Sequence, residues 1–550
     1  MKQTQSTSQP RAPAARHTPA PAAVPRRRVL VVNCYFDDSR RPVRRATKVP
    51  QAMGPVYLAG AFARAHCDVR LYSELASGPL EDEALLGWPD LLVLTGLTNT
   101  FDRMLHLTAY ARTKNPRVVV AAGGPAVRQL PRLAARVFDY ACLGDVEELR
   151  EVARAALGPD YVAEEMEPRF DLAYWLNWLG HVESSRYCNF RCAFCALTGE
   201  GRDYQPYELA ALRRQLVAAG RKRRVLFIDN NFYGNDRAYF DARLALIEEL
   251  RADGYLKEWS AILTNDFFAR ADNLARVRAA GCLLLFSGVE SFDPAWLRQV
   301  NKRQNVVHPT VEMIRRCLEA GIVFCYGLML DTTTRRVADL RRELDFITAT
   351  PEITLPSFLT LSIPLLGTPY FFDLLRQRAL LPRLKLRDLD STTLVTRPLD
   401  PLPEVVAFLR AFETMRGYRL RVLRHTAGFA RRYARRLNRV QLAAVLGNAA
   451  LTCAHDLAST LNGRDWLRRR GRARTYVTTT EPLDDQYTPK FRVAARYAHH
   501  FRPMMITDER GELTAEMLAA GLLKTGKASA STPEITTKTR RHEDTTVCPL

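Results

Sequence analysis

The chain has 550 residues, 47% of them hydrophobic, which is enough for about three domains with apolar cores and excludes a generally disordered protein. Its net charge of +21 suits nucleic acid, an anionic membrane surface or acidic substrates, although arginine is abundant throughout and compositional bias accounts for the charge equally well. Eleven mostly scattered cysteines, no membrane span and no signal peptide lead us to expect a cytoplasmic protein without disulfides.

The N-terminal part alternates strands and helices. Residues 1–28 are basic and rich in Pro, Ala and Thr, so we predict a disordered lead-in. Over residues 29–150, strand patterns alternate with helical patterns, which predicts a doubly wound parallel sheet of the Rossmann-like α/β class. The predicted strands are Val29–Phe36, Val69–Ser73, Leu91–Leu94, Arg117–Ala122 and Tyr140–Gly144, and the predicted helices include Tyr57–His66 and Phe101–Lys114.

Two loops of this sheet fall where ligands bind in such folds, at the carboxyl ends of strands. Residues 95–100 follow the third predicted strand, and Gly123-Gly124 follows the fourth. A Gly-Gly pair is weak on its own, because any tight turn uses it. The loops therefore locate a candidate edge without identifying its ligand.

Three closely spaced cysteines open the next part of the chain. Cys188, Cys192 and Cys195 have the spacing C-x3-C-x2-C, with Phe194 before the last. Three thiolates on one loop can hold three corners of a cubic [4Fe-4S] cluster and leave one iron open to an outside ligand. A zinc site would need a fourth ligand, but no Cys or His follows before Cys282. Buried core cysteines are the remaining alternative, which crowding on one polar loop disfavours.

Beyond the cysteines, apolar strands again alternate with helices, and each strand ends in polar residues. With one strand before the cysteines they make about six units, in the rhythm of a βα barrel, whose chemistry gathers at the carboxyl ends of its strands. The predicted strands, with their polar ends, are Val225–Asn231, Trp259–Asn265, Leu283–Ser291, Phe324–Asp331 and Phe358–Pro364.

The cysteine loop, including the aromatic residue before its third cysteine, resembles the cluster loop of the radical S-adenosylmethionine (radical SAM) superfamily. The resemblance implies a partial (βα)6 barrel over 181–400, reached through a linker over 151–180. It also implies that SAM chelates the open iron and is cleaved to a 5′-deoxyadenosyl radical. The residues that it assigns to SAM binding are Phe194, Asp229, Asn230, Asn265, Ser287, Gly288 and Glu290.

Two of these assignments have ordinary structural alternatives. The triplet from Asp229 to Asn231 departs from the family's often glycine-rich motif, and Asn231 can serve as a helix N-cap instead. The segment from Ser287 to Ser291 matches the family's Gly-x-Glu-Ser strand end. We prefer Glu290 as a ligand contact to Glu290 in a structural ion pair.

The loops of the first sheet together resemble the cobalamin-binding domain that precedes many radical SAM barrels. The D-x-H-x-x-G motif, whose histidine ligates cobalt in other cobalamin proteins, is absent, because the loop after the first strand reads Asp37-Asp38-Ser39-Arg40. We expect cobalamin without a histidine ligand from that motif, and a degenerate module that has lost its cofactor is the alternative. The implied cobalamin contacts are Thr95, Gly96, Leu97, Thr98, Gly123 and Gly124.

The C-terminal part, 401–522, is helical in period and rich in arginine. Its segment from Val440 to Leu461 is apolar with arginines before it, a pattern also typical of an interfacial helix on an anionic membrane. We prefer a buried helix that caps the barrel, and peripheral membrane contact stays open. Residues 523–550 are predicted to be a disordered tail.

These resemblances imply a cobalamin-dependent radical SAM enzyme, most simply a C-methyltransferase acting on an unactivated carbon of a secondary metabolite, lipid or tetrapyrrole. An oxidative cyclase or rearranging enzyme with the same cofactors is the first alternative, and a non-catalytic iron-sulfur redox sensor is the second. The basic surface suits an acidic one-electron donor such as flavodoxin or ferredoxin. Nucleic acid has only the charge in its favour.

Overall fold

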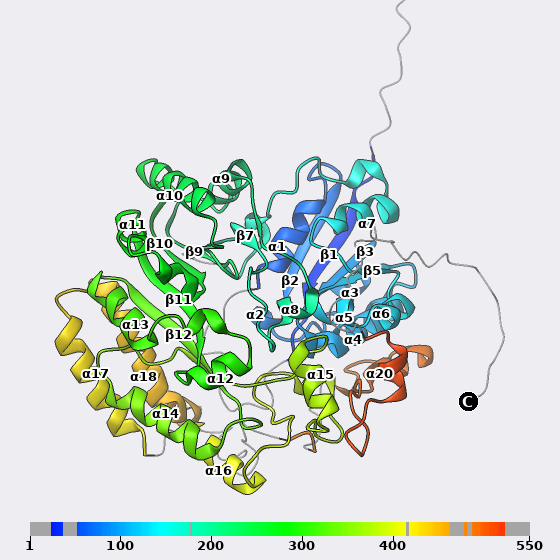
Figure 1. Ribbon diagram of the computed structural model, residues 1–550. Coiled ribbons are helices and arrows are strands. Elements are labelled where there is room, and N and C mark those ends of the chain that lie inside the picture. The colour runs from blue at the N-terminus through cyan, green and yellow to red at the C-terminus, as the bar shows by residue number, and fades with distance from the viewer. Residues whose placement is uncertain are drawn as a thin grey trace, which may run out of the picture.

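The computed structural model describes two parallel sheets that lie side by side, each with helices packed on it (Figure 1). The predicted α/β fold, with a Rossmann-like sheet followed by a partial barrel and C-terminal helices, is confirmed. The lead-in up to residue 23, the loop over 37–51 and the tail over 523–550 lie outside the described residues. The described residues are 24–36, 52–176, 179–413, 417–461, 478–480 and 487–522.

The N-terminal sheet has five parallel strands in the order β2-β1-β3-β4-β5. The strand order reverses between β1 and β3, and sheets of this kind bind ligands at that point, beyond the carboxyl ends of the strands. The strands are β1 (Arg27–Asn33), β2 (Cys67–Ser73), β3 (Leu91–Thr95), β4 (Val119–Gly123) and β5 (Tyr140–Cys142).

One predicted helix of this part is wrong in extent. Instead of a helix over Tyr57–His66, the chain forms α1 (Gly54–Leu58) and a 3-10 turn, and Phe62 is extended. The reason is that Phe62 leaves the helix to pair with Val162. The other helices are α2 (Glu74–Ser77), α3 (Glu83–Gly87), α4 (Phe101–Lys114), α5 (Pro125–Gln129), α6 (Pro131–Val137) and α7 (Glu148–Leu157).

The second sheet has six parallel strands in the order β13-β12-β11-β10-β9-β6, the open half-barrel that was predicted. Its strands are β6 (Leu179–Val182), β9 (Lys222–Phe227), β10 (Leu256–Leu263), β11 (Cys282–Glu290), β12 (Val323–Leu330) and β13 (Phe358–Leu361). The helices between them are α9 (Leu209–Ala218), α10 (Arg237–Ala252), α11 (Asn273–Ala279), α12 (Pro294–Gln299), α13 (Thr310–Glu319) and α14 (Val337–Ala349), and α15 (Pro369–Arg376) follows β13.

The cysteine loop lies between β6 and β9 in the chain and has short elements of its own. They are β7 (Ser185–Arg186), which pairs with β8 (Gln205–Pro206), and helix α8 (Ala196–Glu200), which begins directly after the third cysteine. The predicted linker over 151–180 contains the end of α7 and the start of β6. The domain boundaries stay predictions.

The C-terminal part contributes to both halves of the molecule. Helices α16 (Leu402–Glu413), α17 (Arg419–Tyr433) and α18 (Arg439–Leu461) belong to the barrel, where Gln441 donates to the carbonyls of Leu283 and Gly321 at the amino ends of β11 and β12. Residues 487–522, with α20 (Ala515–Ala519), pack instead against the N-terminal sheet. Among the described helices, none has the length and hydropathy needed to cross a membrane.

Candidate active site

The carboxyl ends of the two sheets face one another, and the cysteine loop lies between them. Arg128 of α5 forms a 2.6 Å ion pair with Glu200 of α8. Arg202, just after α8, donates to the carbonyl of Leu143 at the end of β5, at 3.0 Å. Both contacts join the carboxyl edge of the N-terminal sheet to the segment that carries the cysteines. A ligand bound at one edge would therefore lie next to a ligand bound at the other.

The three cysteines are presented by a short loop whose backbone is fixed from several sides. Cys188 and Cys192 are buried and Cys195 is partly buried. Arg191 donates to the carbonyl of Cys188 at 3.0 Å, and Gln304 places its Nε2 atom 3.4 Å from the sulfur of Cys192. Burial, together with the neighbouring thiols, raises the pKa of Cys188 to about 11. Binding of a metal cluster, which requires thiolates, would therefore release protons.

A buried ion pair lies beside the cysteines. Lys302 donates to Glu290 at 2.9 Å, and its ammonium lies 5.5 Å from the ring centre of Phe194. Glu290 has a positive φ of 65°, which an ordinary side chain adopts only at a cost of about 1–3 kcal/mol. Gly288 has no room for a Cβ atom because the Glu290 carboxylate occupies that space. The structure thus shows Glu290 in an ion pair, which was the alternative interpretation of this residue. Contact between Glu290 and SAM stays a prediction.

Asp229, predicted to bind SAM, is fully buried and supports the cysteine loop instead of facing an open space. Its carboxylate accepts hydrogen bonds from the hydroxyl of Ser184 at 2.7 Å, from the hydroxyl of Ser185 and from the amide of Ser184. Asn230 is exposed at the end of the same strand. The first polar residue after β9 therefore holds the start of the loop, and only the second is free to meet a ligand.

The N-cap alternative for Asn231 is wrong, because Asp236 caps helix α10. Asn231 instead bridges two strand ends: its Nδ2 atom donates to Asn189 at 2.7 Å, and its Oδ1 atom accepts from the amide of Thr264 at 3.2 Å. Asn189 is the residue after the first cysteine, so Asn231 also fixes the loop.

Asn265 and Ser287 come together at the ends of β10 and β11, as predicted from their positions. The Ser287 hydroxyl donates to Asn265 Oδ1 at 2.8 Å. The Nδ2 atom of Asn265 is buried and has no hydrogen-bond partner among the described residues. A buried donor without an acceptor costs about 1–3 kcal/mol, so this atom fits a ligand that supplies one.

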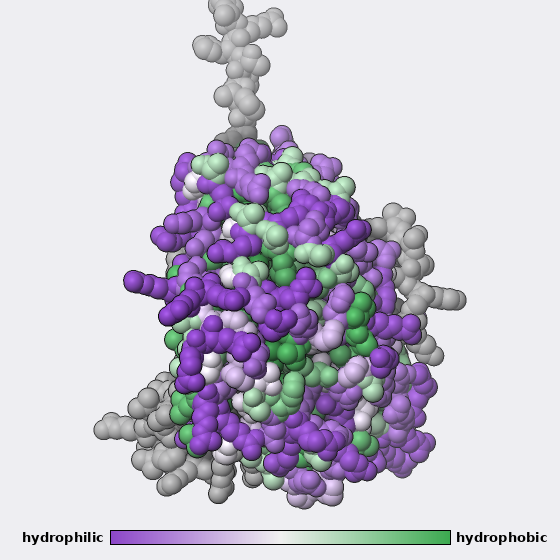
Figure 2. All heavy atoms as spheres, turned by 60° about the vertical axis from the view of Figure 1, so that its left-hand side comes forward, coloured by the Kyte–Doolittle hydropathy of each residue, from purple (hydrophilic) through white to green (hydrophobic). Residues whose placement is uncertain are grey.

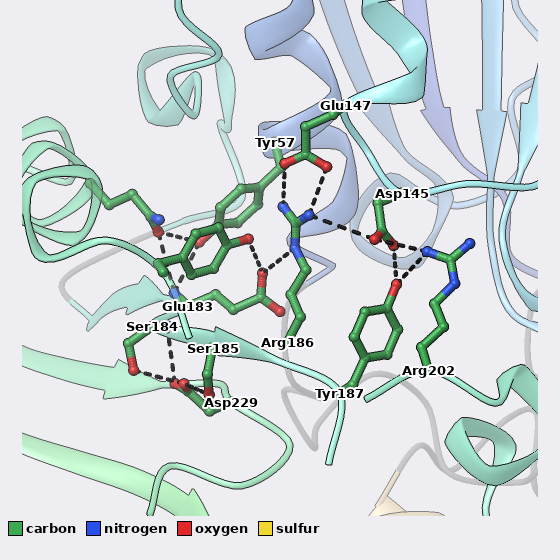
Figure 3. A network of polar contacts seen from close by, with 12 residues as sticks. Tyr57, Asp145, Glu147, Glu183, Ser184, Ser185, Arg186, Tyr187, Arg202 and Asp229 are labelled. Carbon is green, nitrogen blue, oxygen red and sulfur yellow. Dashed lines mark hydrogen bonds and ion pairs between the residues drawn. The ribbon is translucent and has the colours of Figure 1, made fainter. Parts of the chain in front are cut away.

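Ion pairs join the cysteine loop to the N-terminal sheet in an arrangement that Figure 3 shows. Arg186 donates to both carboxylate oxygens of Glu147 at 2.7 and 2.8 Å. Tyr187 donates to Asp145, whose carboxylate also pairs with Arg202 at 2.8 Å. We call these five residues the brace. It connects the end of β5 to the residues directly before Cys188.

Glu183 lies beside the brace, 3.6 Å from Arg186, and its side chain is partly buried. It accepts a hydrogen bond from Tyr207 at 2.8 Å, and its amide donates to the hydroxyl of Tyr57 at 3.0 Å (Figure 3). Burial raises the pKa of this carboxyl to about 7. Sequence reasoning missed the brace and the position of Glu183 beside it. The available signal was the pair of acids in Asp145-Val146-Glu147, directly after a predicted strand.

At the loops after β3 and β4, the edge of the N-terminal sheet offers backbone and apolar surface. Gly124 has a φ of +112°, and a Cβ atom there would lie 2.6 Å from the carbonyl oxygen of Gly96. Gly96 itself has no room for a side chain beside Thr100. Leu97 is 63% exposed at this edge, whereas Thr98 is buried. Of the predicted cobalamin contacts, Leu97 is therefore the most accessible, and the glycines let two loops approach closely.

These residues fit the cofactors that the sequence predicted. Three thiols on one loop suit a cluster with one open iron. The buried amide of Asn265 suits a polar ligand, and the exposed Leu97 beside glycines suits a large flat ring. Among the described residues, no three His, Cys, Asp or Glu side chains meet closely enough to hold a single metal ion. A cubic cluster does not require such closeness, because each cysteine binds a different corner. The loop after β1, where a cobalt-binding histidine is absent from the sequence, lies outside the described residues.

Comparison with protein families matches two parts of the chain. Residues 182–343 match the radical SAM superfamily, and residues 43–154 match the B12 binding domain. The chain thus contains a radical SAM domain behind a B12-binding domain, as predicted, and the radical SAM match supports the prediction of an enzyme. The two domains imply a [4Fe-4S] cluster, SAM and cobalamin as cofactors.

Two curated relatives are methylases. The chain is 25% identical over 268 residues to the hopanoid C-2 methylase of Rhodopseudomonas palustris, which covers 45% of this chain and 50% of that protein. It is also 25% identical over 355 residues to an uncharacterized methyltransferase of Synechocystis, covering 58% of this chain and 63% of that protein. The chain therefore spans about half to two thirds of the length of these relatives.

Two solved structures share the fold. TsrM, a radical SAM methyltransferase from Kitasatospora setae with tryptophan and a SAM analogue bound, has a TM-score of 0.51 at 17% identity, over 70% of this chain and 88% of its own. The cobalamin-dependent radical SAM enzyme OxsB with aqua-cobalamin and SAM bound has a TM-score of 0.53 at 14% identity, over 86% of this chain and 83% of its own. At these identities the likeness concerns the fold alone.

Proposed function

We propose that the protein is a cobalamin-dependent radical SAM methyltransferase that adds a methyl group to an unactivated carbon. The observation that carries this proposal is that the two carboxyl edges face each other across the cysteine loop. Ion pairs and hydrogen bonds join this loop to the N-terminal sheet. Methyl transfer to a substrate radical needs the radical source and the methyl donor to reach the same substrate atom. The names of both curated relatives also support methylation.

The chain's own residues would bind and orient the cofactors. Cys188, Cys192 and Cys195 would hold the cluster. The free amide donor of Asn265 would meet SAM, and Glu290 would meet it beside Lys302. When bound, the cluster and SAM supply a radical that removes hydrogen from the substrate, and cobalamin supplies the methyl group.

The remaining predicted contacts follow the two edges. Phe194, Asn230, Ser287 and Gly288 would line the SAM side, with Asp229 acting through the loop that it supports. On the other side, Leu97 would contact the cobalamin ring, and the other predicted residues of that edge would shape the backbone around it.

A lipid is the substrate class that we favour among secondary metabolites, lipids and tetrapyrroles. The support is the name of the relative from Rhodopseudomonas palustris, whose substrate is a hopanoid. The one-electron donor that we propose is an acidic flavodoxin or ferredoxin, because the net charge of +21 favours an acidic partner. Flavodoxin-dependent SAM cleavage should then slow as ionic strength rises, since salt screens such attraction.

The experiment that tests the proposal uses anaerobically reconstituted full-length protein, a chemical reductant, cobalamin and SAM labelled with deuterium in its methyl group. A hopanoid is the first substrate, and mass spectrometry follows both the substrate and 5′-deoxyadenosine. We expect 5′-deoxyadenosine together with a product in which one labelled methyl group replaces a hydrogen.

Other results would point to the alternatives. A product that has lost two hydrogens and gained no label favours the oxidative cyclase. Failure of the reconstituted protein to cleave SAM at all contradicts the enzymatic proposal and favours a redox sensor. The Cys192→Ala variant is the control for SAM cleavage that does not depend on the cluster.

A further inference from the structure

The amino end of the half-barrel, opposite the candidate active site, carries a basic hollow. Its volume is about 480 Å³, and it lies where β9 and β10 begin. Seven residues line it, five of them basic and none acidic: Arg221, Lys222, Arg223, Arg251, Gly254, Leu256 and Lys257. In barrels of this kind chemistry belongs to the other end of the strands, so this concentration of positive charge is not needed for catalysis.

The positive charge continues along the same end of the sheet. The guanidinium of Arg251 lies against Gly281, at the start of β11, and that of Arg278 lies against Gly321, at the start of β12. The carbonyl of Arg436 also lies beside Gly321 and marks where the segment between α17 and α18 joins the rim. Charged groups therefore lie along the amino ends of β11 and β12, between the hollow and the segment that joins α17 to α18.

Helices α17 and α18 combine arginine with exposed leucine. From residue 419 to residue 455 the sequence contains eight arginines and no acidic residue. On α17, Leu420 and Leu423 are 57% and 58% exposed, although the opposite side of the helix is buried through Val422 and Phe429. A leucine that could have been buried but points outward between arginines is typical of a helix that lies on a membrane.

The same pattern extends to the start of α18. Val440 and Leu446 are 40% and 41% exposed, while Gln441 faces the barrel. Figure 2, which turns the barrel side forward, shows hydrophobic areas bordered by hydrophilic side chains on this side of the molecule. One face of α18 thus caps the barrel, as preferred from the sequence, and its other face is available to a partner.

Some of these arginines form ion pairs within the described residues and others do not. Arg421 pairs with Asp345, and Arg432 lies 3.5 Å from Glu352. By contrast, Arg424, Arg431 and Arg435 are exposed, and none of the three lies within 4 Å of a carboxylate among the described residues. Their guanidinium groups can reach an external anion while their stems cover apolar surface.

We propose that this surface, formed by the hollow and the outer sides of α17 and α18, docks on an anionic phospholipid bilayer. We call it the basic face. Phosphate headgroups would meet the arginines, and Leu420, Leu423 and Val440 would enter the boundary between headgroups and acyl chains. Nucleic acid would also satisfy the charge, but exposed aliphatic side chains gain nothing from a phosphate backbone.

Docking through the basic face leaves the candidate active site open, because the cysteine loop lies at the other end of the strands. The inference therefore does not depend on methyl transfer. It describes attachment to a surface and holds for any substrate.

The test is flotation of the full-length protein with vesicles of phosphatidylcholine alone and of phosphatidylcholine mixed with phosphatidylglycerol. We expect binding to the mixed vesicles, loss of most of it at high salt, and little binding to the neutral ones. The variant Arg424→Gln/Arg431→Gln/Arg435→Gln should bind at least tenfold more weakly. Leu420→Ser/Leu423→Ser should bind several-fold more weakly at low salt and lose any salt-resistant binding.

A matched control removes the same charge elsewhere. Arg117, Arg502 and Arg510 are exposed and lie outside the barrel sheet and its helices, so their change to Gln should leave flotation unchanged. Iron incorporation serves as the check that each variant folds. The proposal is overturned if mixed vesicles do not retain the protein, or if the control weakens binding as much as the basic-face variant. Tighter binding to a short RNA or DNA duplex through the same three arginines would also overturn it.

Discussion

The two carboxyl edges that face each other differ in the kinds of residue that they expose. The barrel edge presents thiols and buried polar side chains, including Asn265, Ser287 and the Glu290–Lys302 pair. The edge of the N-terminal sheet presents glycine backbone and the exposed Leu97. The two parallel sheets therefore present different surfaces at their carboxyl ends. One edge suits a small charged ligand that needs point contacts, and the other suits a large ring that needs a broad surface.

The largest effect that we predict sharpens the barrel side of this comparison. Replacement of Cys188, Cys192 or Cys195 by Ser should abolish the cluster, because each thiolate holds a separate corner. Iron analysis after anaerobic reconstitution should show loss of the cluster, and SAM cleavage should fall to background. Cys325→Ser, which changes a thiol of β12 in the same sheet, is the control and should retain iron.

The next prediction tests the other edge. Gly124→Ala should prevent cobalamin binding, since its Cβ atom would lie 2.6 Å from the Gly96 carbonyl and the φ of +112° is unfavourable for alanine. Iron content should stay normal. Equilibrium dialysis with cobalamin measures the loss.

The control for this glycine is Gly220→Ala. Gly220 also has a positive φ, of +78°, but nothing lies within 4 Å of the position of its Cβ atom. If both variants lose cobalamin equally, backbone strain and not the edge explains the loss. If Gly124→Ala still binds cobalamin normally, the assignment of this edge is wrong.

A smaller effect concerns the brace that joins the two edges. Arg186→Gln should lower stability by about 1–3 kcal/mol, because the arginine forms two short bonds to Glu147 and is only 16% exposed. It should also lower the ratio of methylated product to 5′-deoxyadenosine, since the two edges would no longer be held together.

A double-mutant cycle with Glu147→Gln isolates this contact, and we expect a coupling energy of about 1 kcal/mol. The comparison pair is Arg213 with Glu249, whose side chains are 41% and 52% exposed. Loss of that surface pair should change neither stability nor the product ratio measurably. An unchanged ratio in Arg186→Gln would mean that the brace is only structural.

The smallest prediction is a pH dependence. The pKa of Glu183 is about 7 in the folded protein, against an ordinary value of 4.5, so the folded state binds more protons than the unfolded state between these values. Stability contributed by this group is present below about pH 4.5 and is lost as pH rises to about 7. The slope is at most about 1.4 kcal/mol per pH unit. Denaturant unfolding of Glu183→Gln from pH 5 to 7.5 should show less decline than the wild type, and an equal decline would contradict the assignment.

The sequence predicted local features better than cooperation between distant residues. Helix α4 was predicted with its observed bounds, Phe101–Lys114, since Phe101, Met104 and Leu105 have helical spacing and Arg112 and Lys114 lie in the last turn. The helix predicted over Tyr57–His66 was wrong because a pairing of Phe62 with Val162, a hundred residues away, ended it early. Periodicity carries no information about such a partner.

The same limit applies to the site. The spacing of the cysteines identified the loop, since the ligands are adjacent in the sequence. The roles of Asp229 and Asn231 as supports of that loop required knowledge of what lies beside each strand end. The brace was missed for the same reason, because Arg186 and Glu147 meet only when the two sheets come together.

The central claim is that one chain holds a cluster and cobalamin on facing edges. The most direct measurement is the iron and cobalamin content of the same anaerobically reconstituted sample, determined by metal analysis and absorption spectroscopy. Our account predicts about four irons and about one cobalamin per chain. A full complement of iron with no bound cobalamin would contradict it and leave the N-terminal sheet as a module that has lost its cofactor.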